Sequence, residues 1–426
     1  MQARPAWLRD GYGEDGAVTI DRLDQGGRWL LPDGVEEILP PRARQIEALR
    51  QRILQRFDLW GFELVFPPLL EFLDSLLVGV GGDLDLQTFK VTDQESGRLM
   101  GIRADLTSQA ARIDAHSLRS EGPTRLCYAG TVLRTRGQGL FGSRSPVKVG
   151  AELYGVPGPE GDAEVLALMA ETLAVAGLGT LHIELGHVAI YRALANAAGL
   201  PPAAQDTLFD AVQRKAAADI RALLHGQDVP ADIAKMIITL PSLLGNASVL
   251  PRARQTFAAA PPAVTVALDE LEKTAELARQ RCPALDLGFD LSELHGYNYH
   301  TGTVFSAYAP DHGQALARGG RYDDIGQAFG RGRPATGFDL DLKVLVDLSP
   351  EMPPSVASVR LPTLQGLGES QIRSLWRRVN ELREQGVRVL PQGADGWLAT
   401  AELLWDGTAW VSTLGNEPGR DAPVED

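Results

Sequence analysis

Three neighbouring segments decide the fold of this chain: HGYNYHTGTVF at residues 295–305, RGGRYDDI at 318–325 and ATGFDLDLKVL at 335–345. The first and third contain apolar runs typical of strands, and all three carry polar or aromatic side chains. Gly319 and Gly320 permit a close approach of backbone or ligand because they have no Cβ atom. Together the segments predict the wall of a polar pocket for a small planar or amino-acid ligand.

Outward from these segments, the spacing of apolar residues predicts both helices and strands. The first strong helix starts near residue 41, buries Ile46, Leu49, Ile53 and Phe57, and ends near Gly61. Further helices are predicted at 160–176 and through 187–282. Strands are predicted at 62–66, 86–91, 99–102, 126–133, 147–154, 285–291 and 303–308, with a last strand running into a helix at 335–347. Extended runs joined by short turns indicate an antiparallel sheet.

These elements predict an α+β protein in which an antiparallel sheet is flanked by helices. A chain of 426 residues is long enough for two or three domains. The expected regions are an N-terminal extension (1–30), a core (31–347) with a helical insert at about 187–282, a small C-terminal α/β domain (348–414) and a disordered tail (415–426). In the small domain, the helix face is expected to comprise Ile372, Leu375, Val379 and Leu382, and Asp406-Gly407 predicts a hairpin.

Composition and charge exclude several classes of protein. The formal net charge of −14 argues against a broad nucleic-acid surface, which requires clustered Lys and Arg. Cys127 and Cys282 form no CxxC pair, so neither a disulfide framework nor a zinc knuckle is expected. The N-terminus has no apolar signal core, and no run is long and apolar enough to span a bilayer. We therefore expect a cytoplasmic protein without a membrane partner.

No common catalytic or cofactor signature occurs in the sequence. The P-loop GxxxxGK[ST], HExxH and GxSxG patterns are absent. The glycines at 79–82 do not fit the GxGxxG spacing of a dinucleotide site. The chemistry of the chain is therefore sought in three clusters of polar side chains.

The first cluster, Arg103-Ala104-Asp105-Leu106-Thr107, follows the predicted strand at 99–102. If the strand continues, Asp105 and Thr107 share one face, where a carboxylate and a hydroxyl can receive an α-ammonium group. A helix N-cap by Asp105 or Thr107 is an equally favoured alternative. The second cluster runs from Arg134, whose guanidinium could hold a carboxylate or phosphate, to Glu152 on the returning strand. A surface salt bridge is the alternative for either residue.

The third cluster lies in the opening segments themselves. Aromatic and imidazole groups crowd six positions, at His295, Tyr297, Tyr299 and His300. No carboxylate or cysteine completes a familiar ligand spacing, so a metal site is not expected. Arg321 stands beside the glycine pair at the wall of the predicted pocket.

These clusters resemble the catalytic core of class II aminoacyl-tRNA synthetases, specifically histidyl-tRNA synthetase, over residues 30–347. The helix, strand and prolines at 41–68 resemble the first motif of that family, which forms its dimer interface. The segment at 103–107 resembles the one that holds the amino group of histidine. Arg134 stands at the position of the ATP-binding arginine, and Glu152 at that of a histidine-contacting glutamate. YNYHTGTVF and GGRYD resemble the histidine-specific segment and its partner loop.

The chain also departs from the synthetase pattern where the nucleotide should bind. His295 replaces an activating arginine, Arg136 replaces an acidic residue, and Lys148 replaces a glutamine that reads histidine. The third motif should end in Gly-x-Glu-Arg but reads Asp341-Leu342-Lys343-Val344. Each charge-assisted hydrogen bond to a triphosphate contributes roughly 1.5–3 kcal/mol, and Val344 provides none. If Asp341 faces the same site, its charge also repels phosphate. We therefore expect negligible adenylate formation.

The motifs GYNYHTG, GGRYD and ATGFDLDL resemble those of a paralogous family, the regulatory subunits of ATP phosphoribosyltransferase, more closely than those of the synthetase. The resemblance implies a non-catalytic subunit without tRNA charging, in a hetero-oligomer with a short-form catalytic subunit. That complex performs the first step of histidine biosynthesis and is inhibited by histidine. The resemblance further implies no catalytic residue, no cofactor, and a homodimer through the first-motif helix. The residues expected in a histidine-like pocket are Asp105, Thr107, Arg134, Glu152, Tyr299, His300 and Arg321.

Two other hypotheses stay open at this point. The chain could be an active histidyl-tRNA synthetase or a related adenylating enzyme, against which Val344 and His295 argue. It could also be a free-standing amino-acid-binding protein with no enzyme partner.

Overall fold

A computed structural model describes residues 30–78, 82–137, 142–179, 181–310, 312–349, 357–392 and 401–413. The chain splits into two compact units, residues 1–350 and 351–426. The expected N-terminal extension, apart from residue 30, and the expected C-terminal tail lie outside the described residues. None of the helices in the described ranges combines the length and the apolar character that crossing a bilayer demands.

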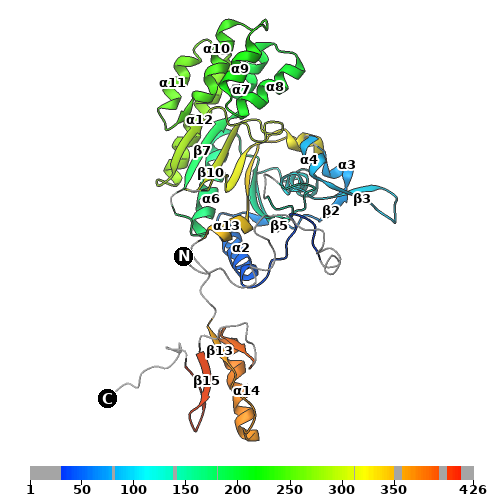
Figure 1. Ribbon diagram of the computed structural model, residues 1–426, viewed down its shortest axis with the longest axis vertical. Helices are drawn as coiled ribbons and strands as arrows, with labels where there is room; N and C mark the ends of the chain where they lie inside the picture. Colours follow the sequence, from blue (N-terminus) through cyan, green and yellow to red (C-terminus); the bar gives the residue numbers. More distant parts are fainter. Residues whose placement is uncertain are drawn as a thin grey trace, which may run out of the picture. The chain divides into compact units, whose positions relative to one another are not determined.

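The large unit is built on a nine-stranded sheet with the order β1-β5-β6-β12-β11-β10-β7-β9-β8 (Figure 1). Its strands are β1 (Glu63–Leu64), β5 (Thr124–Thr131), β6 (Val147–Tyr154), β12 (Ala335–Asp341), β11 (Ala317–Arg321), β10 (Thr303–Tyr308), β7 (His182–His187), β9 (Asp286–Asp290) and β8 (Leu244–Gly245). The predicted antiparallel pairing is confirmed from β5 through to β7. The β1–β5 and β7–β9 pairs are parallel, so the antiparallel expectation is wrong for these two pairs.

The strand register gathers polar residues into a row on one face of the sheet, since directly paired residues point to the same side. We call this the polar row; from β5 to β10 its members are Tyr128, Gly150, Asp339, Arg318 and Ser306. Two residues from this row along the same strands, Glu152 pairs with Gly337, and Gly337 pairs with Gly320. A Cβ atom at Gly337 would overlap the Glu152 carboxylate, and one at Gly320 would crowd the His300 ring. The two glycines therefore leave the space that both functional side chains occupy.

Helices cover the opposite, apolar face of the sheet. Helix α2 (Arg42–Leu59) buries Ile46, Leu49, Ile53 and Phe57, as the periodicity predicts. Phe57 meets Phe338 of β12 edge to face, with ring centroids 5.9 Å apart. Helices α6 (Gly158–Val175) and α13 (Leu342–Leu348) complete the layer, and Figure 1 shows α13 beside α2. The long helix and the last strand–helix unit thus share one core.

A helical insert separates β7 from β9 and gathers at one end of the large unit (Figure 1). It comprises α7 (Val188–Ala198), α8 (Pro202–Gln213), α9 (Ala217–Leu224), α10 (Ala231–Thr239), a 3₁₀ turn (Leu240–Ser242), α11 (Val249–Thr256) and α12 (Pro262–Arg281). The two-residue strand β8 interrupts the helices and pairs with β9, which the helical pattern does not predict. Tyr191 of α7 and Phe209 of α8 stack around Tyr297, at centroid distances of 5.5 and 5.1 Å. The insert therefore contacts the segment that precedes β10.

A second, three-stranded sheet stands beside the core, and it corrects one expected strand. It contains β2 (Leu70–Phe72), β4 (Leu99–Ile102) and β3 (Phe89–Thr92) in that order, with the short helix α3 (Leu73–Leu76) following β2. The strand predicted at 86–91 is wrong at its start, because α4 (Gly82–Gln87) occupies those residues. The strand at 99–102 is confirmed but does not continue, since α5 (Thr107–Arg112) begins five residues later and passes into a π-helical turn (Ile113–Leu118). A 3₁₀ turn (Ile325–Phe329) precedes β12.

The small unit is an α/β layer with its own core. Strands β13 (Ser358–Arg360), β14 (Arg388–Leu390), β15 (Ala401–Trp405) and β16 (Trp410–Ser412) have the order β14-β13-β15-β16. Helix α14 (Glu369–Glu384) buries Leu375, Val379 and Leu382 against them. The hairpin predicted at Asp406-Gly407 joins β15 to β16. The small unit therefore folds around an apolar cluster separate from that of the large unit.

Candidate functional site

A cavity of about 730 Å³ opens on the polar face of the large sheet, within the size range of small-molecule sites. Its walls come from β6, β11 and β12, from the segment at 294–300, and from helices α7 and α8. Of the seven residues expected from the sequence, six line it: Asp105, Thr107, Arg134, Glu152, Tyr299 and His300. The segments that hold them are far apart in the sequence, and only Glu152 lies on a strand of the sheet.

Glu152 lies buried at the floor of the cavity between two phenols. Its carboxylate accepts hydrogen bonds from the hydroxyls of Tyr128, at 2.8 Å, and of Tyr322. Burial raises the pKa of Glu152 to about 8, although both phenol hydrogen bonds oppose the rise. A ligand that brings a hydrogen-bond donor or a positive charge would stabilise the ionised carboxylate.

His300 presents an unpaired imidazole nitrogen beside this carboxyl group. Its Nδ1 lies 3.1 Å from the carbonyl of Arg321, which can only accept, so Nδ1 carries the proton. Nε2 is then an acceptor, and it is buried without a hydrogen-bond partner among the described residues. Burial lowers the pKa of His300 well below its usual value, which keeps the ring neutral. The site therefore offers a fixed acceptor to an N–H or O–H group.

Asp105 and Thr107 reach the cavity by a route that differs from the predicted one. The strand ends at Ile102; Asp105 lies in the turn that leads into α5, and Thr107 is the first residue of that helix. Asp105 accepts the backbone N–H of Leu106 at 2.7 Å, so its side chain helps to shape the turn without capping the helix. Burial, then repulsion from Asp339, raises the pKa of Asp105. An ammonium group bound here would relieve both effects.

The cations of the cavity are mostly engaged within the protein. Lys148 pairs with Asp339 at 2.6 Å, and both side chains are largely buried. Arg134 is nearly buried and donates from Nε to the carbonyl of Ala104 at 3.2 Å. Arg318 of β11 also lines the cavity. These contacts set the charges that an incoming ligand meets.

Arg321, the seventh expected residue, does not line the cavity. Its guanidinium pairs with buried Asp162 at 2.8 Å and with Asp323 at 3.0 Å. It also donates to the carbonyls of Val156 and Gly158. The arrangement ties β11 to the start of α6, so the structure gives Arg321 contacts within the protein and none with the cavity.

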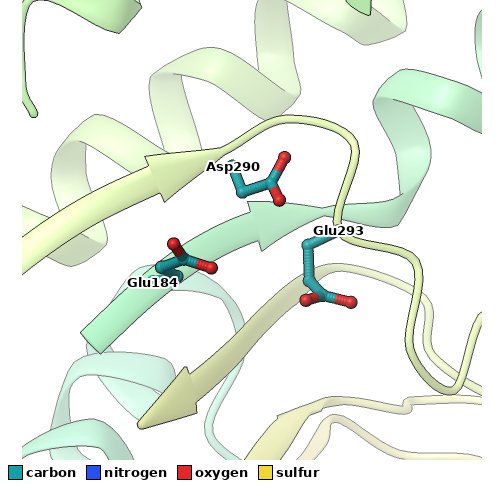
Figure 2. Close-up of side chains that lie close together, drawn as sticks. All are labelled: Glu184, Asp290 and Glu293. Carbon is teal, nitrogen blue, oxygen red and sulfur yellow. The ribbon is translucent and has the colours of Figure 1, made fainter. Parts of the chain in front are cut away.

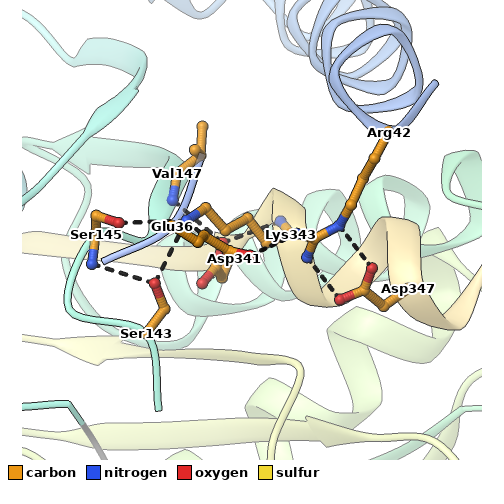
Figure 3. Close-up of polar contacts among 8 residues, drawn as sticks. All are labelled: Glu36, Arg42, Ser143, Ser145, Val147, Asp341, Lys343 and Asp347. Carbon is orange, nitrogen blue, oxygen red and sulfur yellow. Dashed lines mark hydrogen bonds and ion pairs between the residues drawn. The ribbon is translucent and has the colours of Figure 1, made fainter. Parts of the chain in front are cut away.

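The segment that departs from the third synthetase motif does not line the cavity, and Figure 3 shows the polar contacts of Asp341 and Lys343 within the protein. Asp341 caps α13 by accepting the N–H of Lys343, and it also accepts the N–H of Val147. It is not among the residues that line the cavity, so the condition under which its charge would repel a bound phosphate is not met there. Lys343 is buried and pairs with Glu36 at 3.0 Å. Val344 packs against the core of the large unit.

Three carboxylates meet at the far end of the polar row: Glu184, Asp290 and Glu293 (Figure 2). Lys215 places its Nζ 2.6 Å from Asp290, whose other oxygen accepts from Ser292. Burial alone would raise the pKa of Glu293, but hydrogen bonds and attraction from His295 lower it to about 2. The chain thus supplies its own cations to this cluster, which explains how the carboxylates can lie so close together.

The structure adds residues that the sequence patterns miss. The cavity residues outside the expected set include Tyr322, Asp339, Arg318, Tyr191, Phe209, Asp206 and Asp210. Alternation along β12 could have suggested Asp339, because Gly337 and Asp339 share a face. Tyr191, Phe209 and the two aspartates come from the helical insert, whose packing onto the core has no local sequence signal.

Comparisons with known proteins agree with this geometry. A family model described as histidyl-tRNA synthetase matches residues 34–345. ATP phosphoribosyltransferase regulatory subunits from Thioalkalivibrio sulfidiphilus and Pseudomonas aeruginosa are each 53% identical over 374 residues, covering 88% of this chain and 93% and 91% of theirs. A Bacillus halodurans structure of an ATP phosphoribosyltransferase regulatory subunit/histidyl-tRNA synthetase superposes with a TM-score of 0.76 at 27% identity, over 87% of this chain and 94% of that one. Histidyl-tRNA synthetase from a Nostoc species shares the fold, with a TM-score of 0.74 at 18% identity over 88% and 91%.

Proposed function

The chain belongs to the family of ATP phosphoribosyltransferase regulatory subunits, which have a histidyl-tRNA synthetase-like fold, and from this premise we propose how it acts. It is a non-catalytic subunit that a short-form ATP phosphoribosyltransferase requires for activity in the first step of histidine biosynthesis. It binds histidine in the cavity described above and has no tRNA partner and no synthetase activity. Its two cysteines are free thiols, which suits a reducing cytoplasm.

The observation that carries this proposal is the charge of the cavity. Its lining contains more carboxyl groups (Asp105, Glu152, Asp206, Asp210, Asp339) than permanent cations (Arg134, Lys148, Arg318). A triphosphate carries several negative charges and requires cations around it. An amino acid with a cationic end suits the excess of carboxyl groups. The lining therefore favours an amino acid over ATP.

The polar groups of the cavity also suit an imidazole side chain. Glu152 with its two phenols and His300 through Nε2 offer acceptors beside each other. An imidazole ring carries one or two N–H donors in a plane. Asp105 and Thr107 lie at the cavity wall, where they can receive the α-ammonium group. The same groups explain why a pocket for histidine persists without a nucleotide site.

Reconstitution tests the proposed role. The short-form catalytic subunit is assayed for phosphoribosyl-ATP formation alone, with this chain, and with this chain plus histidine. Coupling between sites is commonly worth on the order of 5- to 150-fold, so we expect activation by at least the lower value and its loss on adding histidine. Equal rates with and without the chain would exclude a regulatory subunit and leave a free-standing binding protein. Histidine-dependent pyrophosphate exchange by the purified chain would establish an adenylating enzyme instead.

A homodimer through the first-motif region is supported by exposed apolar side chains. We call this surface the apolar edge; it follows α2 and comprises Leu59, Leu64, Phe66, Leu69 and Leu70. Phe66 is 78% exposed. Exposed large apolar side chains that gather in one short stretch of the chain are a feature of protein interfaces. We propose that a second copy of the chain covers it.

Replacing Phe66 with glutamate should therefore convert the dimer to a monomer at micromolar concentration, because the interface would have to bury an unpaired charge. The oligomeric state is measured by light scattering during size-exclusion chromatography. Leu404→Glu is the matched control, since Leu404 is 50% exposed on β15 of the small unit and lies outside the apolar edge. A Phe66→Glu variant that elutes as the wild type would rule out this interface.

A further inference from the structure

Arg318 occupies the centre of the polar row, between Asp339 on β12 and Ser306 on β10. It is an exposed side chain on β11 that lines the cavity, and its neighbour Gly319 lines the cavity as well. Within the part of the chain that the structure describes, no hydrogen bond or ion pair holds its guanidinium. Its five N–H groups are therefore available to a ligand.

The carboxylates near Arg318 pair with other groups of the protein and not with its guanidinium. Asp339 is its cross-strand neighbour, but that carboxylate pairs with Lys148 at 2.6 Å. Glu293 lies within electrostatic reach, but it accepts hydrogen bonds from His295. Asp339 and Glu293 thus each have a nearer partner than Arg318, Lys148 and His295 respectively.

The other basic groups of the cavity are held by the protein. Lys148 is neutralised by Asp339, and Arg134 donates to the carbonyl of Ala104. His295 stands where the synthetase family has an arginine, yet its Nε2 lies 3.1 Å from the carbonyl of Gly319 and its Nδ1 lies 3.3 Å from Glu293. These contacts withdraw His295 from any anionic group in the cavity.

An amino acid needs a cation opposite its α-carboxylate as well as an acceptor for its ammonium group. We propose that Arg318 binds the α-carboxylate of the amino-acid ligand and makes the site reject analogues that lack this group. The planar guanidinium can hold both carboxylate oxygens at once, a geometry that an ammonium side chain cannot match. This inference rests on the proposed function, because it assumes that the cavity binds an amino acid.

The test measures binding of histidine and of histamine, which keeps the imidazole and the ammonium group but lacks the carboxylate. Isothermal titration calorimetry is run on the full-length chain as wild type, Arg318→Ala and Arg318→Lys. We expect Arg318→Ala to weaken histidine binding roughly 10- to 100-fold, the range expected for charge-assisted hydrogen bonds, while histamine binding changes less than about threefold. The affinity of Arg318→Lys for histidine should lie between those of the wild type and Arg318→Ala, since lysine keeps the charge but loses the paired geometry.

Arg221→Ala on α9 is the matched control, because Arg221 is an exposed arginine that does not line the cavity. Wild-type affinity for histidine in Arg318→Ala would overturn the role of Arg318 and leave the proposed function standing. An equal loss for histidine and histamine would also overturn it, since the residue would then act without regard to the carboxylate. Failure of the wild type to bind histidine at all would overturn the amino-acid pocket itself and this inference with it.

Discussion

Arg321→Ala is expected to lower the free energy of unfolding by about 3–5 kcal/mol, the usual cost of breaking a buried ion pair from one side. Asp162 is almost fully buried and pairs with Arg321 at 2.8 Å. Without the guanidinium, its carboxylate would be left in the core without its cation. The carbonyls of Val156 and Gly158 would lose a donor as well. Thermal and urea unfolding of the variant and the wild type measure the difference.

Arg254→Ala provides a matched control for this loss. Arg254 also pairs with two carboxylates, Asp269 and Glu272, each at 2.7 Å, but both acids are more than 60% exposed. An exposed pair of this kind contributes about 0–1 kcal/mol, so the control should unfold almost as the wild type does. If Arg321→Ala instead unfolds as the wild type and fails to bind histidine, Arg321 acts on the ligand as the sequence suggested.

The contribution of Glu152 to the stability of the ligand-free protein should fall as the pH rises from about 4.5 to about 8. The pKa of its carboxyl group is 4.5 in the reference state and about 8 in the fold. Between these values the unfolded chain releases this proton while the folded chain keeps it, so rising pH favours unfolding. The contribution is complete below pH 4.5 and is lost above pH 8. The contribution of Glu152 to the free energy of unfolding is at most on the order of several kcal/mol.

Glu152→Gln isolates this effect, because the amide is neutral at every pH and still accepts a hydrogen bond from a phenol. Its melting temperature should decline much less between pH 5 and pH 8 than that of the wild type, as followed by circular dichroism. Glu95→Gln, at an exposed glutamate, should keep the wild-type slope. An unchanged slope in Glu152→Gln would show that the buried carboxyl group does not control the pH dependence.

Local patterns in the sequence predict the elements whose apolar spacing is regular. Helix α2 and strands β4 and β6 agree with expectation; α2 buries side chains at helical spacing, and β6 is a continuous buried run. The run at 86–91 was expected to be a strand, but a short apolar run fits a helix end as well, and α4 takes its first residues. Here tertiary packing decides between two local conformations.

The site is harder to predict because its residues come from segments that are far apart in the sequence and meet only in the folded chain. Asp105 and Thr107 line the cavity even though the strand on which their shared face depended ends at Ile102. Asp341 and Arg321 stand beside cavity residues in the sequence but face protein partners. Arg318 was not expected, because its orientation follows from its pairing with Asp339. The family resemblance predicts a pocket for a histidine-like ligand, and the structure gives the side chains that line the cavity.

The position of β12 in the middle of the sheet has a consequence for how the chain folds. The paired side chains of Lys148 on β6 and Asp339 on β12 are 191 residues apart, and the whole helical insert lies between them. During synthesis the helical insert leaves the ribosome before β12 does, and its helices can form through local contacts. The central strands must wait for the residues up to Leu348, which also bring α13 to α2. High contact order of this kind slows folding, and the edge of β6 that pairs with β12 stays unpaired until the residues of β12 have been made.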